Sequence, residues 1–87
     1  MDFIKGERKE VRIKIASRKN DPFTIDEATY ELVKWGDTLI ETSGVATITD
    51  KEVSAIIEPL NVGTYNLTFT YKIVGETMKA PVQIKVR

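Results

Sequence analysis

Apolar and polar residues alternate along much of this chain, and a period of two is typical of β-strands that bury one face. The first alternating run is residues 10–16, where valine and isoleucine alternate with arginine and lysine. The two clearest runs are residues 65–73 and 78–86, which are separated by a turn that contains Gly75. Two consecutive runs of this length predict a long hairpin with one apolar side on each strand.

Shorter strand patterns fill the region between these runs. Turn-forming clusters separate them, so we expect strands over residues 23–25, 28–35, 38–42, 45–49 and 52–58. These clusters are SRKNDP at 17–22, Gly36-Asp37, Ser43-Gly44 and Asp50-Lys51. Phe3 and Ile4 form either a short first strand or a loop that covers the core. No segment has a sustained helical period, so we predict an all-β sandwich of about seven antiparallel strands, with a small barrel as the alternative.

The aromatic residues of the segment GTYNLTFTY (63–71) allow two interpretations. On an exposed face they could stack on a sugar or a base. However, the alternation places Tyr65, Leu67 and Phe69 together, opposite asparagine and threonine, so we expect these three residues in the core. Gly63 stands two residues before Tyr65. This pair resembles the corner of immunoglobulin-like sandwiches, where a tyrosine at the start of the penultimate strand bonds to nearby backbone.

The order of these features resembles the immunoglobulin-like N-terminal domains of phage baseplate upper proteins and related phage tail modules. The resemblance covers about residues 8–86 and rests on the segments NDPFTIDEATYELVKWGDTLI, VATITDKEVSAIIEP, VGTYNLTFTYKIVGET and APVQIKV. It implies a non-enzymatic part of a virion tail or baseplate that acts through protein contacts, with host-surface attachment as a further option.

The composition removes most kinds of catalysis. The chain has no histidine and no cysteine, which excludes histidine-based nucleophile activation, thiolate zinc sites and disulfides. Asp26, Glu27 and Glu31 are close in sequence, but a solvated strand or loop explains them better than a glycosidase pair across a cleft. Asp21, Asp26 and Glu27 could offer oxygen atoms to calcium, yet they form no calcium-loop motif. We therefore expect no enzyme activity, no cofactor and no metal site.

The net charge is zero, but residues 1–20, 21–58 and 59–87 carry net charges of +4, −7 and +3. The first and last strands of a sandwich are commonly neighbours, so we expect one positively charged sheet that includes Arg12, Lys14 and Lys85. Other outward-facing basic residues would join it: Lys72, Lys79 and Arg87. The acidic middle would supply much of the opposite sheet through Glu31, Glu41, Glu52 and Glu58. Such polarity can orient subunits or attract a polyanion; the alternative is a solvated face with edge lysines that prevent aggregation.

Trp35 is the aromatic residue that we select as a contact for a partner. It shares its strand face with Val33, opposite the expected core face, and stands beside the Gly36-Asp37 turn. An exposed tryptophan there can anchor a protein or stack on a sugar. The alternative is that the strand twists and Trp35 closes one end of the core. Ile56 also faces away from the expected core and is a weaker candidate.

The length of 87 residues predicts one domain over residues 1–87. The final strand is predicted to reach Arg87. This fits either a separate protein or one module of a longer protein. The N-terminal segment resembles no signal peptide and no run of residues is apolar enough for a membrane span, so we expect cytoplasmic synthesis. The resemblance to phage tail modules implies a final place in a virion. The expected partners are other virion or surface proteins, including copies of the chain itself, with a glycan as the alternative. Nucleic acid is not expected, because the net charge is zero and no aromatic residue lies among the exposed basic ones.

Overall fold

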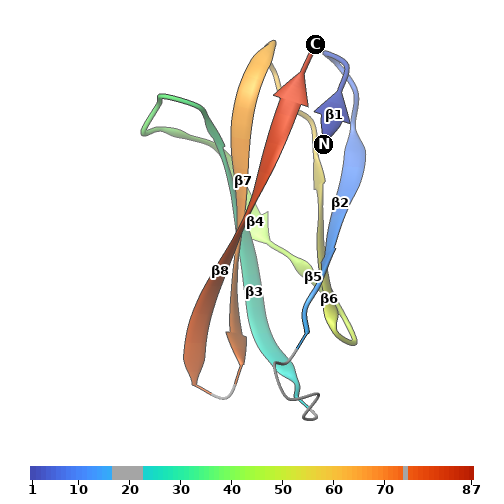
Figure 1. Cartoon of the computed structure of the whole chain (residues 1–87), viewed down its shortest axis with the longest axis vertical. Helices are drawn as coiled ribbons and strands as arrows, with labels where there is room; N and C mark the ends of the chain where they lie inside the picture. Colours follow the sequence, from blue (N-terminus) through green and yellow to red (C-terminus); the bar gives the residue numbers. More distant parts are fainter. Residues whose placement is uncertain (17–22, 74) are drawn as a thin grey trace.

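The computed structural model describes residues 1–16, 23–73 and 75–87, and its regular structure consists of strands (Figure 1). The predicted turn at residues 17–22 and the predicted calcium ligand Asp21 lie outside the described residues. The described strands are β1 (Asp2–Phe3), β2 (Lys9–Lys14), β3 (Ile25–Lys34), β4 (Ile40–Val45), β5 (Thr47–Thr49), β6 (Glu52–Ile57), β7 (Gly63–Ile73) and β8 (Glu76–Val86).

The strands form two sheets that face each other. The larger sheet has the order β1-β8-β7-β3-β4 and the smaller has the order β2-β6-β5. This arrangement confirms the all-β, sandwich-like prediction. The prediction of only antiparallel strands was wrong, because β1 runs parallel to β8. Phe3 is 1% exposed, so the burial of this one side chain explains why so short a strand is held at the edge of the sheet.

The core lies between the sheets and follows the predicted alternation. On β7, Tyr65, Leu67 and Phe69 have no exposed surface, which confirms that these side chains are core and not a stacking platform. The smaller sheet contributes Val11 from β2 and Val53 from β6, among others. Tyr71, farther along β7, is half-buried. Each large side chain that leaves water contributes about 1.5–3 kcal/mol, so this alternation is the main reason why the strands face each other as they do.

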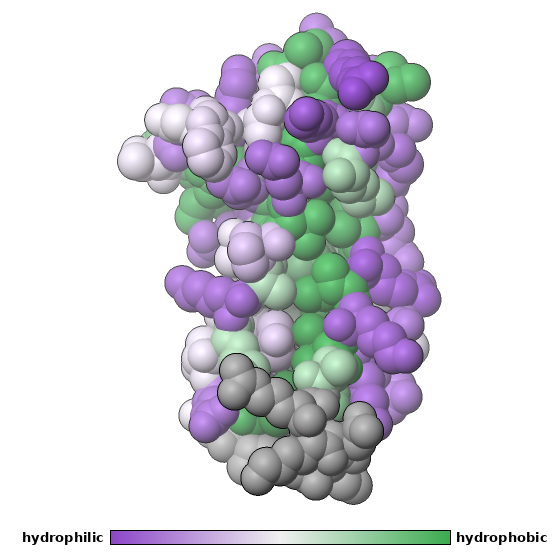
Figure 2. Space-filling view, in the orientation of Figure 1, coloured by the Kyte–Doolittle hydropathy of each residue, from purple (hydrophilic) through white to green (hydrophobic). Residues whose placement is uncertain are grey.

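The edge formed by β8 and β2 is only partly covered. Figure 2 shows hydrophobic groups along the middle of this edge, with hydrophilic groups on both sides. Ile13 and Val82 pack against the core but are only half-buried, because β1 pairs with β8 solely at Lys85 and Val86. Pro81 fits this long strand because its backbone faces the same free side as that of Lys85, which donates to Met1 O. A missing N–H at that position breaks no bond to β7.

Two predicted strand boundaries were wrong for identifiable reasons. The Ser43-Gly44 pair does not end a strand, because β4 runs through it to Val45. Gly44 is paired with Tyr30, and a Cβ atom at position 44 would lie 3.3 Å from the Tyr30 ring. The glycine therefore makes room for an aromatic side chain instead of a turn. Likewise, Ile25 belongs to β3, which continues through a register shift between Ile25 and Glu27.

The predicted separation of charge between the two sheets was also wrong. Arg12 and Lys14 lie on β2 in the smaller sheet, whereas Lys85 lies on β8 in the larger one. The acidic residues divide as well: Glu31 is on the larger sheet and Glu52 is on the smaller one. The reason is topological, since β1 and not β2 is the neighbour of β8.

Candidate functional site

Large apolar side chains are exposed in two chain segments that hydrogen bonds join at the end of the molecule where β7 begins. We call these residues the end patch: Trp35 and Leu39 of the β3–β4 connection, Ile40 at the start of β4, and Leu60 and Val62 of the β6–β7 connection. Trp35 is 67% exposed and Leu39 is 81% exposed. Scattered exposed apolar residues are normal, whereas a group of them at one place is typical of an interaction surface.

The β3–β4 connection projects from the body of the molecule (Figure 1). β3 ends at Lys34, and the chain reverses at Gly36, whose φ of 87° is accessible to glycine at little cost. The Asp37 N–H donates to Lys34 O at 3.0 Å and closes the turn. This local geometry leaves Trp35 and Leu39 outside the core on either side of the turn.

Hydrogen bonds hold the two connections of the end patch side by side. The Trp35 N–H donates to Thr64 O at 2.8 Å. Glu41 accepts from both sides of the second connection: from the Leu60 N–H at 3.4 Å and from the Tyr65 hydroxyl at 3.0 Å. The Tyr65 hydroxyl in turn accepts from the Asn61 N–H at 3.1 Å. The end patch is therefore supported by fixed backbone, which lowers the entropy that a partner must remove on binding.

Ionisation of the Tyr65 hydroxyl is expected to make the stability of the fold depend on pH. Burial raises the pKa of Tyr65, the hydrogen bond to Glu41 adds to the rise, and the Asn61 N–H opposes it. The folded chain thus keeps this proton to a higher pH than the unfolded chain, whose tyrosines titrate near about pH 10. The contribution of the protonated Tyr65 hydroxyl to the free energy of unfolding is complete below the pKa of tyrosine in the unfolded chain. It is lost as the pH rises through the pKa of Tyr65 in the folded chain.

We therefore expect the free energy of unfolding to fall at alkaline pH, and to fall less steeply in Tyr65→Phe, which has no proton to lose at this position. Urea denaturation of both proteins between about pH 8 and about pH 11 measures the two slopes. Equal slopes for the two proteins would contradict the expected role of the Tyr65 hydroxyl.

The residues that the sequence predicted as partner contacts fall into two groups on opposite faces of the molecule. Trp35 is exposed, as the alternation predicted, and does not close the core. Val33 is half-buried on the same outer face of the larger sheet, which also carries Lys85. Ile56, Arg12 and Lys14 lie instead on the smaller sheet. Whether any of them contacts a partner stays a prediction.

Arg12 already has acidic neighbours within the chain. Its guanidinium lies 2.7 Å from Glu10 and 3.2 Å from Glu52. The hydrogen bond and charge of Glu10, followed by the charge of Glu52, raise the pKa of Arg12. A partner would have to compete with both carboxylates, so Arg12 is a weaker contact than its exposure suggests.

Sequence reasoning missed Leu39, Ile40, Leu60 and Val62. These residues stand in or beside connections, where strand periodicity carries no information. The sequence feature that could have revealed them is the presence of large apolar residues shortly after the Gly36-Asp37 turn and shortly after Pro59. Polar residues are usual at such positions.

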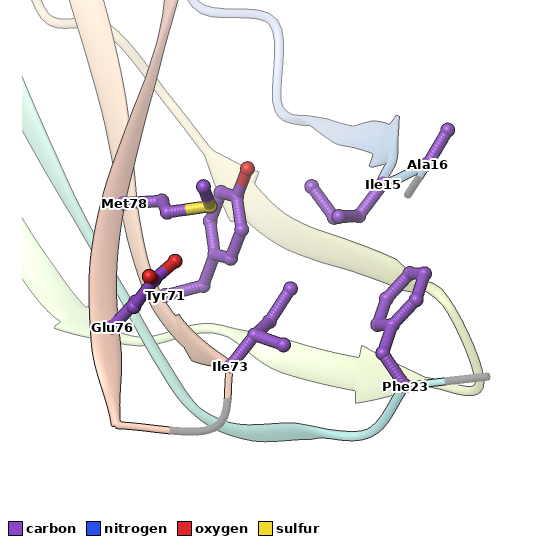
Figure 3. Close-up of a pocket in the computed structure, with 7 residues that line it drawn as sticks. All are labelled: Ile15, Ala16, Phe23, Tyr71, Ile73, Glu76 and Met78. Atoms are coloured by element: carbon purple, nitrogen blue, oxygen red, sulfur yellow. The ribbon is translucent and has the colours of Figure 1, made fainter. Parts of the chain in front are cut away.

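A hollow of about 380 Å³ lies at the opposite end of β7 (Figure 3). It is lined by Ile15, Ala16, Phe23, Tyr71, Ile73, Glu76 and Met78. Among the described residues that line it, Glu76 is the single carboxylate, and one carboxylate does not make the pair of acids that glycoside hydrolysis requires. Ala16 and Phe23 directly flank residues outside the described range, so we assign no site to this hollow.

Among the described residues, no group of three or more acidic side chains is placed to hold a metal ion. Glu27 lies 3.3 Å from Lys72 in an ion pair. Within residues 1–16, 23–73 and 75–87 there is also no helix of the length and apolarity needed to cross a membrane.

Comparisons of the chain with protein-family models, with curated proteins and with solved structures find no match. The resemblance to phage tail modules therefore stays a prediction.

Proposed function

We propose that this chain is an immunoglobulin-like β-sandwich without catalytic activity, which binds another protein through the end patch. The strand order supports the fold assignment: β2, β6 and β5 follow the order of strands B, E and D in immunoglobulin domains, and β3, β7 and β8 are placed like strands C, F and G. The Tyr65 hydroxyl, bonded to the Asn61 backbone at the start of the penultimate strand, supports it further.

The single observation that carries the proposed function is the exposure of Trp35 within an apolar patch on fixed backbone. Tryptophan is among the residues that contribute most to protein–protein binding when a partner covers them. The resemblance to phage baseplate and tail modules extends the proposal to the partner, which would be another protein of a virion tail or baseplate.

The test compares Trp35→Ala with Ile56→Ala, which removes a similarly exposed apolar side chain from the other sheet. The immobilised chain is used to capture proteins from cells that express it, and binding of each captured protein is then measured after purification. We expect a virion protein whose binding weakens at least about tenfold in Trp35→Ala and is unchanged in Ile56→Ala. Equal effects of the two variants would refute the end patch, and a partner from outside a virion would refute the phage assignment.

A second candidate function is glycan binding on the outer face beside Trp35. Asn66 lies between Val33 and Gln83 in the sheet register, so two amide side chains are neighbours on the face that carries Trp35. Amides donate and accept hydrogen bonds to sugar hydroxyls while a tryptophan ring covers the apolar side of the sugar. A glycan array separates the candidates: binding that is lost in both Trp35→Ala and Asn66→Ala favours the glycan, and an array without binding excludes it.

A further inference from the structure

The outer face of the larger sheet divides its charge along the strands. β8 carries the exposed basic residues Lys79 and Lys85, and β3 carries the exposed acidic residues Glu27 and Glu31. β7 lies between these strands and presents mostly uncharged residues on this face, including Asn66, Thr68 and Thr70. The face is therefore basic along β8 and acidic along β3, and the strand between them is uncharged except for Lys72 at one end.

Most of these charges are too far apart to neutralise one another within a single chain. Lys79 is level with Thr70, and Glu31 is level with the adjacent outer-face residue Thr68. The whole width of β7 separates them, and strands two positions apart in a sheet are about 9–10 Å from each other. Within the described part of the chain, neither Lys79 nor Glu31 forms an ion pair. In contrast, Lys72 and Glu27 occupy neighbouring strands and do pair.

A second copy of the same face has the complementary pattern. When two faces are brought together about a two-fold axis parallel to β7, the β8 side of one copy lies over the β3 side of the other. The same contacts then occur twice, as in any interface with two-fold symmetry. A partner of a single charge sign would be attracted by one side of the face and repelled by the other, so a second copy is the better match.

We propose that two copies of this chain associate face to face through the larger sheet, with Lys79 of each copy level with Thr29 of its partner and therefore between the partner's Glu27 and Glu31. Edge-to-edge pairing through β8 is disfavoured by Lys79 and Pro81 on its free edge. The strand β7 presents mostly polar residues to the contact, so we expect a weak dimer. The dimer should depend on salt, because exposed charges are screened within about 10 Å at moderate ionic strength. This inference rests on other residues than the end patch, although Trp35 lies on the same outer face.

The experiment is sedimentation equilibrium over a range of protein concentrations, at about 0.05 M and about 0.5 M salt. We expect a monomer–dimer equilibrium at low salt that shifts to monomer at high salt. Glu31→Lys and Lys79→Glu should each weaken the dimer at least about tenfold, because each places like charges opposite one another. The dissociation constant of the double variant should return to within about threefold of that of the original protein, because each pair again joins opposite charges, with the signs exchanged.

Lys14→Glu is the matched control, since it makes the same change of charge on an exposed residue of the other sheet. It should leave the dimer unchanged. A monomer at every concentration and salt level would overturn the proposal, as would a double variant no tighter than the single ones. Concentration-dependent NMR shifts in the unmodified protein provide a test without substitutions: shifts on the outer face of β7 support the proposal, and shifts confined to β2 and β6 overturn it.

Discussion

Replacing Phe69 with alanine is expected to lower the free energy of unfolding by about 3–5 kcal/mol. The side chain has no exposed surface, and its neighbours in the larger sheet are Tyr30 on β3 and Ala80 on β8. Truncation removes buried apolar area and leaves a cavity that flanking strands cannot fill, since each is held in register by its own ladder. A chain of this length has a total stability of roughly 4–13 kcal/mol, so much of it would be lost.

Urea denaturation followed by circular dichroism measures this effect, and Thr70→Ala is the control. Thr70 is the next residue on β7, but its side chain lies on the outer face and is half-buried, so we expect a loss within about 1 kcal/mol. Fluorescence is a poor probe here, because Trp35 is already largely exposed in the folded chain. Similar losses in both variants would mean that Phe69 does not belong to the core and would reopen the interpretation of residues 63–71 as a stacking surface.

Replacing Phe3 with alanine is expected to have a cost of the same class, up to about 3–5 kcal/mol, but a different outcome. β1 has only two residues, and its buried anchor is the Phe3 ring, over which Lys9 Nζ lies 4.6 Å from the centroid. Without the ring, little buried apolar surface remains to offset the conformational entropy that is lost when this short strand is ordered. We therefore expect β1 to detach while the remaining strands stay folded, which is local unfolding.

Amide hydrogen exchange distinguishes these outcomes. The Lys85 N–H donates to Met1 O and the Arg87 N–H donates to Phe3 O, both at 2.9 Å. Both amides should exchange much faster in Phe3→Ala, whereas the amide of Ile84, which faces β7, should stay protected. Ile4→Ala, which alters an exposed neighbour, should change neither. Faster exchange along the whole of β8 would contradict local detachment and would make Phe3 essential to the complete fold.

The sequence predicted burial well where one face of a strand meets the core. Tyr65, Leu67 and Phe69 alternate with polar residues because one side of β7 faces the core and the other faces water. The alternation therefore predicts directly which side chains are buried. The same logic predicted the exposure of Trp35. It predicted β4 but not its continuation to Val45, since a glycine that accommodates the Tyr30 ring is indistinguishable in sequence from a glycine that begins a turn.

Strand order was beyond the reach of the pattern, because alternation is local and does not say which strands are neighbours. The predicted positive sheet failed for this reason, and the division of charge between β8 and β3 became visible only once β7 was found between them. The end patch was missed in part for a related reason. Leu39, Leu60 and Val62 lie in connections. The bonds that bring those connections together, from Trp35 to Thr64 and from Leu60 and Tyr65 to Glu41, join residues far apart in sequence.

The parallel pairing of β1 with β8 has a mechanical consequence. A force that pulls residues 1 and 87 apart would slide these two strands along each other. It would load together the bonds that join Met1, Phe3 and Lys5 to Gln83, Lys85 and Arg87. Bonds loaded in this way share the tension, whereas those of a hairpin pulled open from its end break one after another. The terminal strands thus form a small clamp across the two ends of the chain, and the Phe3 side chain holds that clamp closed.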